Sequence, residues 1–142
     1  MKTVMCGFCM ILLLTIQLKA QDTMVVRKDV LAKASTSWDG RRLPDYPKGR
    51  PEITILKIVI PPHERLPLHM HPVINAGVVI KGNLTVVTEE NETLHLKAGD
   101  SIVEVVDKGH YGKNDGNEPA EIIIFYAGVE GTPITVYEEK VM

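Results

Sequence analysis

Aromatic residues and cysteines are scarce in this chain of 142 residues. Only 5% of the residues are aromatic, with two Phe, one Trp and four Tyr. Any hydrophobic core must therefore be mainly aliphatic. Both cysteines, Cys6 and Cys9, lie close to the N-terminus. The chain beyond residue 20 has no thiol, which excludes a disulfide framework and a cysteine nucleophile from that part.

The chain also has no large excess of charge of one sign. The formal net charge is −2, and 24% of the residues are charged without forming a long block of one sign. This balance gives no indication of a nucleic-acid partner or of a charged interaction tail. A hydrophobic content of 44% is ordinary for one globular domain. No convincing helical period follows residue 20, so a helical bundle is not expected.

The first twenty residues form a pattern typical of a secretory signal peptide. Lys2 precedes an apolar run over residues 4–18, which is short for a membrane span, and Lys19-Ala20-Gln21 follows. We predict cleavage after Ala20 and export to the periplasm or the extracellular space, with no stable membrane anchor afterwards. An uncleaved N-terminal anchor and a buried helix are the alternatives.

Residues 21–51 are predicted to be an N-terminal arm. Residues 22–35 show no firm period and suit an edge strand or a short helix. Residues 36–51 contain three Pro and two Gly. Proline fixes φ and removes a hydrogen-bond donor, so this stretch is expected to be a loop or an extended segment.

From residue 52 onward, short runs rich in β-branched residues alternate with Gly, Pro, Asn and Asp. They predict strands at 53–60, at 76–90 with a turn at 81–83, at 101–106, at 121–129 and at 132–139, with a second hairpin turning near 90–91. Many short strands with frequent turns indicate an all-β sandwich or barrel over residues 52–142. Uncovered strand edges in such a domain also make a homodimer an expected assembly.

Two histidines one residue apart stand in the sequence PLHMHPVIN. In a strand, His69 and His71 point to the same face, which suits two ligands of one metal ion. If the chain stays extended through Pro72, Asn75 lies on that face too. His110 is the candidate for a third imidazole. The pair alone is a weak motif, because most histidines are ordinary hydrogen-bonded residues, and ordinary strand histidines remain the alternative.

This stretch resembles the first sequence motif of the cupin superfamily, G(x)5HxH(x)3-4E(x)6G. His69, Met70 and His71 fill the HxH, Asn75 stands where the family has glutamate, and Gly82 is the closing glycine. A second stretch resembles the second motif, G(x)5PxG(x)2H(x)3N. There Gly99 is followed by the common Asp100, His110 is the histidine and Asn114 the final asparagine. Two correctly spaced motifs are far more specific than one.

The resemblance covers roughly residues 53–130 and implies a small double-stranded β-helix, the jelly-roll barrel of cupins. It further implies a divalent metal ion, Fe, Mn, Ni or Zn, bound by His69, His71 and His110, with Asn75 at the fourth position. The partner implied is a small-molecule ligand or substrate.

The chain departs from the two motifs at four positions. His63 and Asp107 replace glycines and Val105 replaces a proline, all at turns. At the fourth position, Asn75 offers a neutral amide where the family has a carboxylate, so an ion held by three neutral histidines keeps its full charge. We expect weaker affinity for hard ions such as Mn²⁺ and an open position suited to an anionic or enediol-like substrate.

Two classes of function follow from this reasoning. The first is an exported metal-dependent enzyme of the oxygenase or isomerase type, supported by the three histidines but without an obvious general base. The second is a non-catalytic module that binds a small ligand, with or without metal. A purely structural barrel is a third alternative, since one fold hosts many functions.

Overall fold

The computed structural model describes residues 25–137, and within that range it contains nine β-strands and no helix. Residues 1–24 and 138–142 lie outside the described part. The predicted signal peptide, and the end of the strand predicted at 132–139, therefore fall outside it. No helix among residues 25–137 is long and apolar enough to cross a membrane.

The strands form two antiparallel sheets. The four-stranded sheet has the order β1-β8-β3-β6, built from β1 (Pro51–Ile60), β8 (Ala120–Val129), β3 (Ile74–Lys81) and β6 (Ser101–Val103). The five-stranded sheet has the order β5-β4-β7-β2-β9, built from β5 (Thr93–Lys97), β4 (Asn83–Thr88), β7 (His110–Lys113), β2 (His69–Met70) and β9 (Val136–Tyr137). The all-β, jelly-roll prediction is confirmed.

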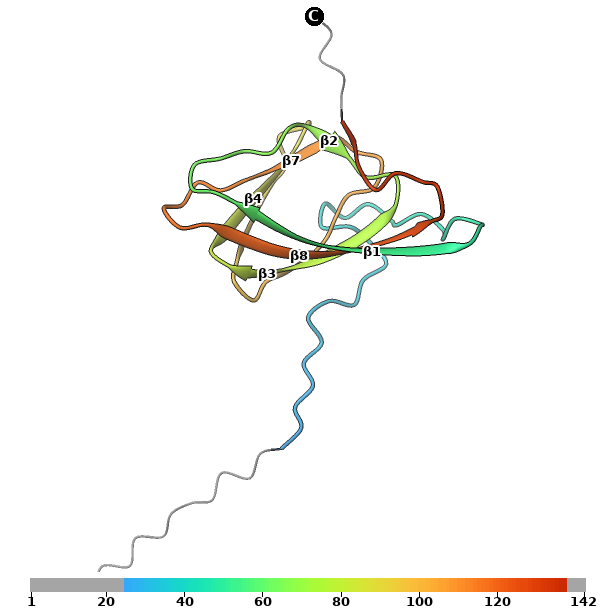
Figure 1. Ribbon diagram of the computed structural model, residues 1–142, viewed down its shortest axis with the longest axis horizontal. Coiled ribbons are helices and arrows are strands. Elements are labelled where there is room, and N and C mark those ends of the chain that lie inside the picture. Colours follow the sequence, from blue (N-terminus) through green and yellow to red (C-terminus); the bar gives the residue numbers. More distant parts are fainter. Residues whose placement is uncertain (1–24, 138–142) are drawn as a thin grey trace, which may run out of the picture.

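The two sheets face one another and enclose the core, with β1, β8 and β3 on one side and β4, β7 and β2 on the other (Figure 1). Aliphatic side chains dominate the buried set, as the scarcity of aromatic residues requires. Tyr126 is its one aromatic member and is 2% exposed. Alternate residues of β8 are buried, which places Ile122, Ile124 and Tyr126 on the inner face.

The sequence located most strands but misjudged several features. Of the strand predicted at 132–139, only Val136 and Tyr137 form a strand within the described residues. The turn at 81–83 does not close a hairpin, because β3 and β4 belong to different sheets and the chain crosses between them at Gly82. Gly82 has a φ of 71°, and a Cβ there would lie 2.6 Å from the carbonyl oxygen of Pro119. β6 ends at Val103 instead of residue 106, and His110 begins a strand, β7, where no strand was predicted.

The arm contains neither the edge strand nor the helix considered for residues 22–35, in the part from residue 25 onward. Instead it is fastened to the barrel by Lys108, whose side chain is 2% exposed. Its ammonium group contacts a carboxylate oxygen of Asp39 at 3.1 Å and one of Glu90 at 2.8 Å, and it also contacts Glu92. A buried cation thus links Asp39 of the arm to two carboxylates of the turn between β4 and β5.

Candidate metal centre

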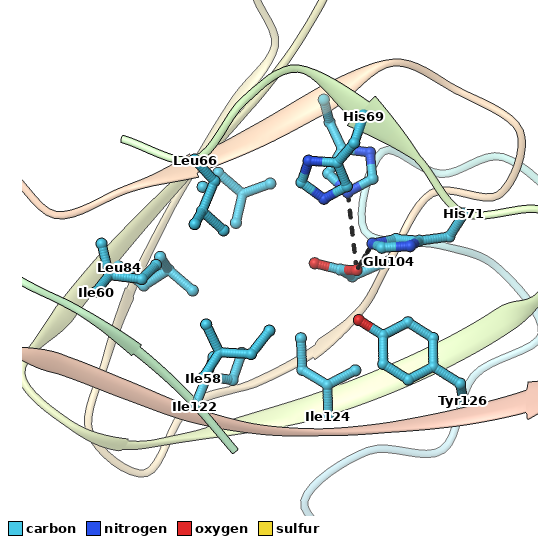
Figure 2. Close-up of a pocket in the computed structure, with 13 residues that line it drawn as sticks. Ile58, Ile60, Leu66, His69, His71, Leu84, Glu104, Ile122, Ile124 and Tyr126 are labelled. Atoms are coloured by element: carbon cyan, nitrogen blue, oxygen red, sulfur yellow. Dashed lines mark ion pairs between the residues drawn. The ribbon is translucent and has the colours of Figure 1, made fainter. Parts of the chain in front are cut away.

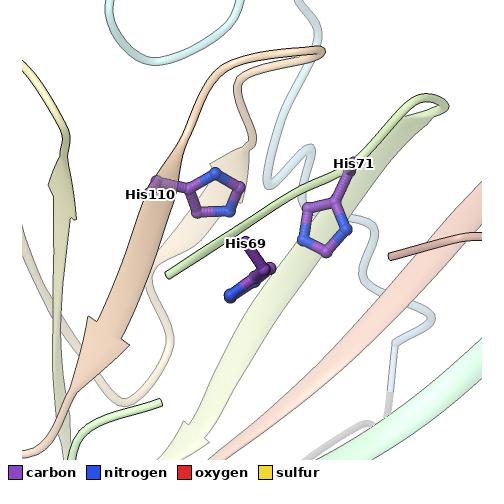
Figure 3. A group of neighbouring side chains, drawn as sticks. All are labelled: His69, His71 and His110. Atoms are coloured by element: carbon purple, nitrogen blue, oxygen red, sulfur yellow. The ribbon is translucent and has the colours of Figure 1, made fainter. Parts of the chain in front are cut away.

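Strand pairing brings the three predicted histidines together. His69 of β2 lies opposite His110 of β7 in register, so the two side chains share the inner face of the five-stranded sheet. His71 follows two residues after His69 and points the same way. The nitrogen atoms available as ligands, one from each histidine, all lie within 4.8 Å of one another, and all three residues are buried (Figure 3).

Each imidazole is held by a backbone carbonyl through its Nδ1 atom. The carbonyl oxygens are those of Pro67 for His69, at 2.7 Å, of Ile134 for His71, at 2.7 Å, and of Lys108 for His110, at 2.9 Å. A carbonyl only accepts hydrogen bonds, so every Nδ1 donates its proton. In the neutral imidazoles the lone pair of each Nε2 therefore remains free. A histidine that binds a metal through Nε2 has this same tautomer, with the Nδ1 proton donated to a second group.

A carboxylate that the sequence reasoning missed lies beside these nitrogens. Glu104 follows directly after β6, and its side chain is buried. Its Oε2 atom lies 3.1 Å from Nε2 of His71 and 3.8 Å from Nε2 of His110 (Figure 2). One signal was available, because Glu104 is the only charge in the apolar run SIVEVV and alternates with the buried Ile102.

The pKa values of these groups are coupled through their proximity. Burial would raise the pKa of Glu104, but the neighbouring imidazoles of His110 and His71 lower it to about 2. Burial would lower the pKa of His110, yet Glu104 raises it above its ordinary value. Burial lowers the pKa of His69, and the charges of the other two histidines lower it further. The lowered pKa of His69 favours its neutral, ligating form.

Buried polar atoms without hydrogen-bond partners are concentrated at this point. In the described residues five such side-chain atoms occur, and four belong here: both amide atoms of Asn75, Oε2 of Glu104 and Nε2 of His110. Buried polar groups are ordinarily paired, so several unpaired acceptors converging on one place indicate a missing positive group. Donor atoms on a common ion lie about 3.0–3.4 Å apart for bonds near 2.1 Å, and the Glu104–His71 distance fits.

The residues present therefore fit a divalent ion. The cupin domain family matches residues 56–126 of this chain. The chain belongs to this family. None of the curated proteins matches the sequence.

Solved cupin structures share the fold at low sequence identity. An uncharacterised Klebsiella pneumoniae protein with a double-stranded β-helix domain is 22% identical, with a TM-score of 0.54, and the match covers 66% of this chain and 89% of that one. A DMSP lyase from Ruegeria pomeroyi is 18% identical, with a TM-score of 0.53 and coverage of 60% and 42%. Oxalate decarboxylase from Bacillus subtilis, a protein with Mn(II) centres, is 24% identical, with a TM-score of 0.51 and coverage of 60% and 23%. This cupin spans less than half the length of the last two.

Asn75, the predicted fourth ligand, does not lie on the face of the histidine strand. The chain bends at Pro72 and Val73 and enters the opposite sheet, so Asn75 belongs to β3 instead of a continuation of β2. It is 1% exposed, and its backbone oxygen accepts a hydrogen bond from the amide of Glu104 at 3.2 Å. The chain therefore does not stay extended through Pro72, which was the condition for Asn75 to share a face with His71. The fold instead places Asn75 next to Glu104.

A small cavity of about 30 Å³ adjoins the histidines, large enough for two or three water-sized groups. Its polar lining consists of the three histidines, Glu104 and Tyr126, and Figure 2 shows the Tyr126 hydroxyl directed toward Glu104 and His71. The other lining residues are aliphatic or glycine: Ile58, Ile60, Leu66, Leu84, Val86, Gly112, Ile122 and Ile124. The lining thus contains neither Lys nor Arg.

The remaining histidines and loop residues stay apart from this centre. His63 and His95 are exposed, and Nδ1 of His95 contacts the hydroxyl of Thr85 at 3.1 Å. Lys113 pairs with Asp115 at 2.8 Å. Asn114, the last residue of the second cupin motif, is buried and donates to the carbonyl oxygens of Ile60, Pro61 and Glu118. Asn114 therefore connects the end of β1 to the turn before β8 through hydrogen bonds.

Proposed function

We propose that this cupin holds a divalent metal ion, Fe, Mn, Ni or Zn, through His69, His71 and His110. The proposal includes a metal-dependent reaction of the oxygenase or isomerase type on a small molecule. The observation that carries it is the orientation of the three imidazoles, since each Nδ1 is bound to a carbonyl and each Nε2 is left to face the others. Metal-binding cupins, such as the oxalate decarboxylase with Mn(II) centres, support the class of cofactor.

The chain's own residues define what such a site does. The three carbonyl contacts orient the imidazoles before any ion binds, so little reorganisation is needed. The aliphatic wall excludes water, and the Tyr126 hydroxyl supplies a hydrogen-bonding group on the opposite side of the cavity. An ion bound here supplies Lewis acidity or one-electron chemistry. The small cavity restricts the group that reaches it to a few atoms.

The test is elemental analysis of the untagged protein beside a His69→Ala/His71→Ala variant. We expect one equivalent of a transition metal in the natural protein and none in the variant, because two of the three nitrogens are gone. A His95→Ala variant serves as the control and should keep its metal, since His95 is exposed on β5. Equal trace metal in the natural protein and the double variant would refute the proposal.

A non-catalytic binding module is the second candidate, favoured by the nearly aliphatic lining of the cavity. Oxygen consumption and product analysis with small diols and thiols separate the two functions. Turnover that disappears with the metal supports an enzyme. Saturable binding of the same compounds without turnover supports the module.

Export and self-association complete the proposal. The charge and hydropathy of residues 1–20 support export to the periplasm or beyond, and the mass of the secreted chain tests cleavage after Ala20. The homodimer is supported by β1, which has a neighbour on one side only, and by its exposed Ile53, Ile55 and Val59.

A further inference from the structure

We propose that Glu104 is the fourth ligand of the metal ion, supplying from a neighbouring strand the carboxylate that cupins ordinarily carry at the position of Asn75. This inference rests on the proposed metal site. It concerns the ligand set of the site and is separable from the reaction.

Strand register places the two residues side by side. Ala76 of β3 lies opposite Val103 of β6, so one step further along the ladder Asn75 lies opposite Glu104. The hydrogen bond from the amide of Glu104 to the carbonyl oxygen of Asn75 extends the pairing to that step. Opposite residues of an antiparallel pair point to the same face with Cβ atoms about 5 Å apart.

On its other side Asn75 lies opposite Tyr126 of β8. Glu104, directly after β6, Asn75 of β3 and Tyr126 of β8 therefore form one row across the four-stranded sheet. All three are buried, and the row faces the histidines of the other sheet. In this row the amide of Asn75 stands at the position of the motif carboxylate, and the carboxylate of Glu104 lies next to it.

The contacts of Glu104 require a positive group between it and the histidines. Its Oε2 atom is an acceptor, and Nε2 of a neutral His71 or His110 is an acceptor as well, at 3.1 and 3.8 Å. Two acceptors facing each other in a buried place are unfavourable unless a proton or a cation lies between them. One metal ion between them accepts a lone pair from each of the three atoms, Oε2 of Glu104 and Nε2 of His71 and His110.

A proton on His71 is the competing explanation, because it would give a buried ion pair with Glu104. Such a proton satisfies one nitrogen only, since Oε2 lies 3.8 Å from the nitrogen of His110, which has no hydrogen-bond partner. An ion-pair role also predicts no loss of metal affinity when the carboxylate is neutralised. The two explanations therefore differ in what they predict for metal binding.

Glu104 also changes the charge expected at the centre. With Asn75 as the fourth group, a divalent ion keeps a charge of +2, but a carboxylate reduces it to +1. Hard ions prefer carboxylate oxygen, so Glu104 restores the affinity that Asn75 was expected to cost. The substrate then has no need to provide the missing negative ligand, which agrees with the aliphatic lining of the cavity.

The experiment compares MnCl2 binding by calorimetry in the natural protein, Glu104→Gln, and Glu104→Gln/Asn75→Glu. Glutamine has nearly the shape of glutamate, so the single variant removes the charge and little else. We expect it to lose at least about tenfold in affinity, the lower bound for disturbing even an outer-shell partner. The double variant returns a carboxylate to the same row, on a side chain one methylene longer than asparagine. Its affinity should recover most of the loss seen in the single variant. Glu121→Gln, on the outer face of β8, is the control and should bind as the natural protein does.

The outcomes separate this inference from the proposed function. If the natural protein binds no Mn²⁺ or other divalent ion through its histidines, the proposed function fails. If it binds Mn²⁺ and Glu104→Gln binds equally well, Glu104 is not a ligand and only the inference is overturned. If Glu104→Gln binds Mn²⁺ more weakly and Glu104→Gln/Asn75→Glu does not regain affinity, a carboxylate at position 75 cannot replace Glu104. That result overturns the inference that the two positions are equivalent. Should Glu104→Gln not fold, infrared difference spectra of the natural protein decide: MnCl2 should shift a carboxylate stretching band, and an unchanged band overturns the inference.

Discussion

Three non-glycine residues in the described part of the chain, His63, Asn91 and Asp107, adopt positive φ values of 61°, 64° and 52°. His63 and Asp107 stand at two of the four positions where the cupin motifs carry glycine. Both turns thus have the backbone conformation that favours glycine, although a histidine and an aspartate occupy them. A side chain in this region is strained, because its Cβ approaches the following carbonyl.

Replacing His63 by glycine should therefore stabilise the protein. The left-handed conformation costs a non-glycine residue about 1–2 kcal/mol. Glycine has more conformational freedom in the unfolded chain, which lowers the gain in stability by about 0.5–1 kcal/mol. We expect His63→Gly to raise the free energy of unfolding by about 0.5–1 kcal/mol, measured in urea. His63→Ala keeps the Cβ and should bring no gain. A glycine variant no more stable than the alanine variant would show that the turn is not strained.

At the scale of elements, the outer face of the four-stranded sheet is unusually apolar. Ile55 of β1 lies opposite Phe125 of β8, and the two side chains are 57% and 47% exposed. Two positions further along β1, Lys57 forms an ion pair with Glu121 at 2.6 Å. Because β1 is an edge strand, this face and this edge together offer a surface to a second copy of the chain.

We expect the variant Ile55→Lys/Phe125→Glu to separate the proposed homodimer into monomers. The new pair imitates the neighbouring Lys57–Glu121 pair, so it should leave the sheet intact while making the face polar. Sedimentation velocity measures the mass. Tyr46→Lys changes a residue of the arm that is 78% exposed and should remain dimeric. A natural protein that sediments as a monomer, or a double variant that still dimerises, would contradict the proposed interface.

The sequence predicted most elements because their signals are local. Runs of β-branched residues ending at turns located β1, β4, β5 and β8, and the two motifs supplied the three histidines. The meeting of His69 with His110 depends on pairing between β2 and β7, two strands far apart in the sequence. Asn75 was misplaced because Pro72 sends the chain into the other sheet. Glu104 was missed because its place next to Asn75 exists only in the folded register.

At the scale of the whole molecule, two sheets and one arm are arranged around a small polar centre in an aliphatic barrel. The five-stranded sheet contributes the histidines, and the four-stranded sheet contributes Glu104, Asn75 and Tyr126. The buried Lys108 ties the arm to the same barrel, and its backbone oxygen accepts the hydrogen bond from His110. Metal binding should therefore draw on both sheets and stabilise the fold as a unit.

The most direct test of the metal centre is a crystal structure of the protein soaked with ZnCl2, with anomalous scattering recorded at the zinc absorption edge. We expect one strong anomalous peak inside the barrel, about 2.1 Å from Nε2 of His69, His71 and His110 and from a carboxylate oxygen of Glu104. A barrel interior without a peak, or zinc bound only at the protein surface, would contradict the proposed metal centre.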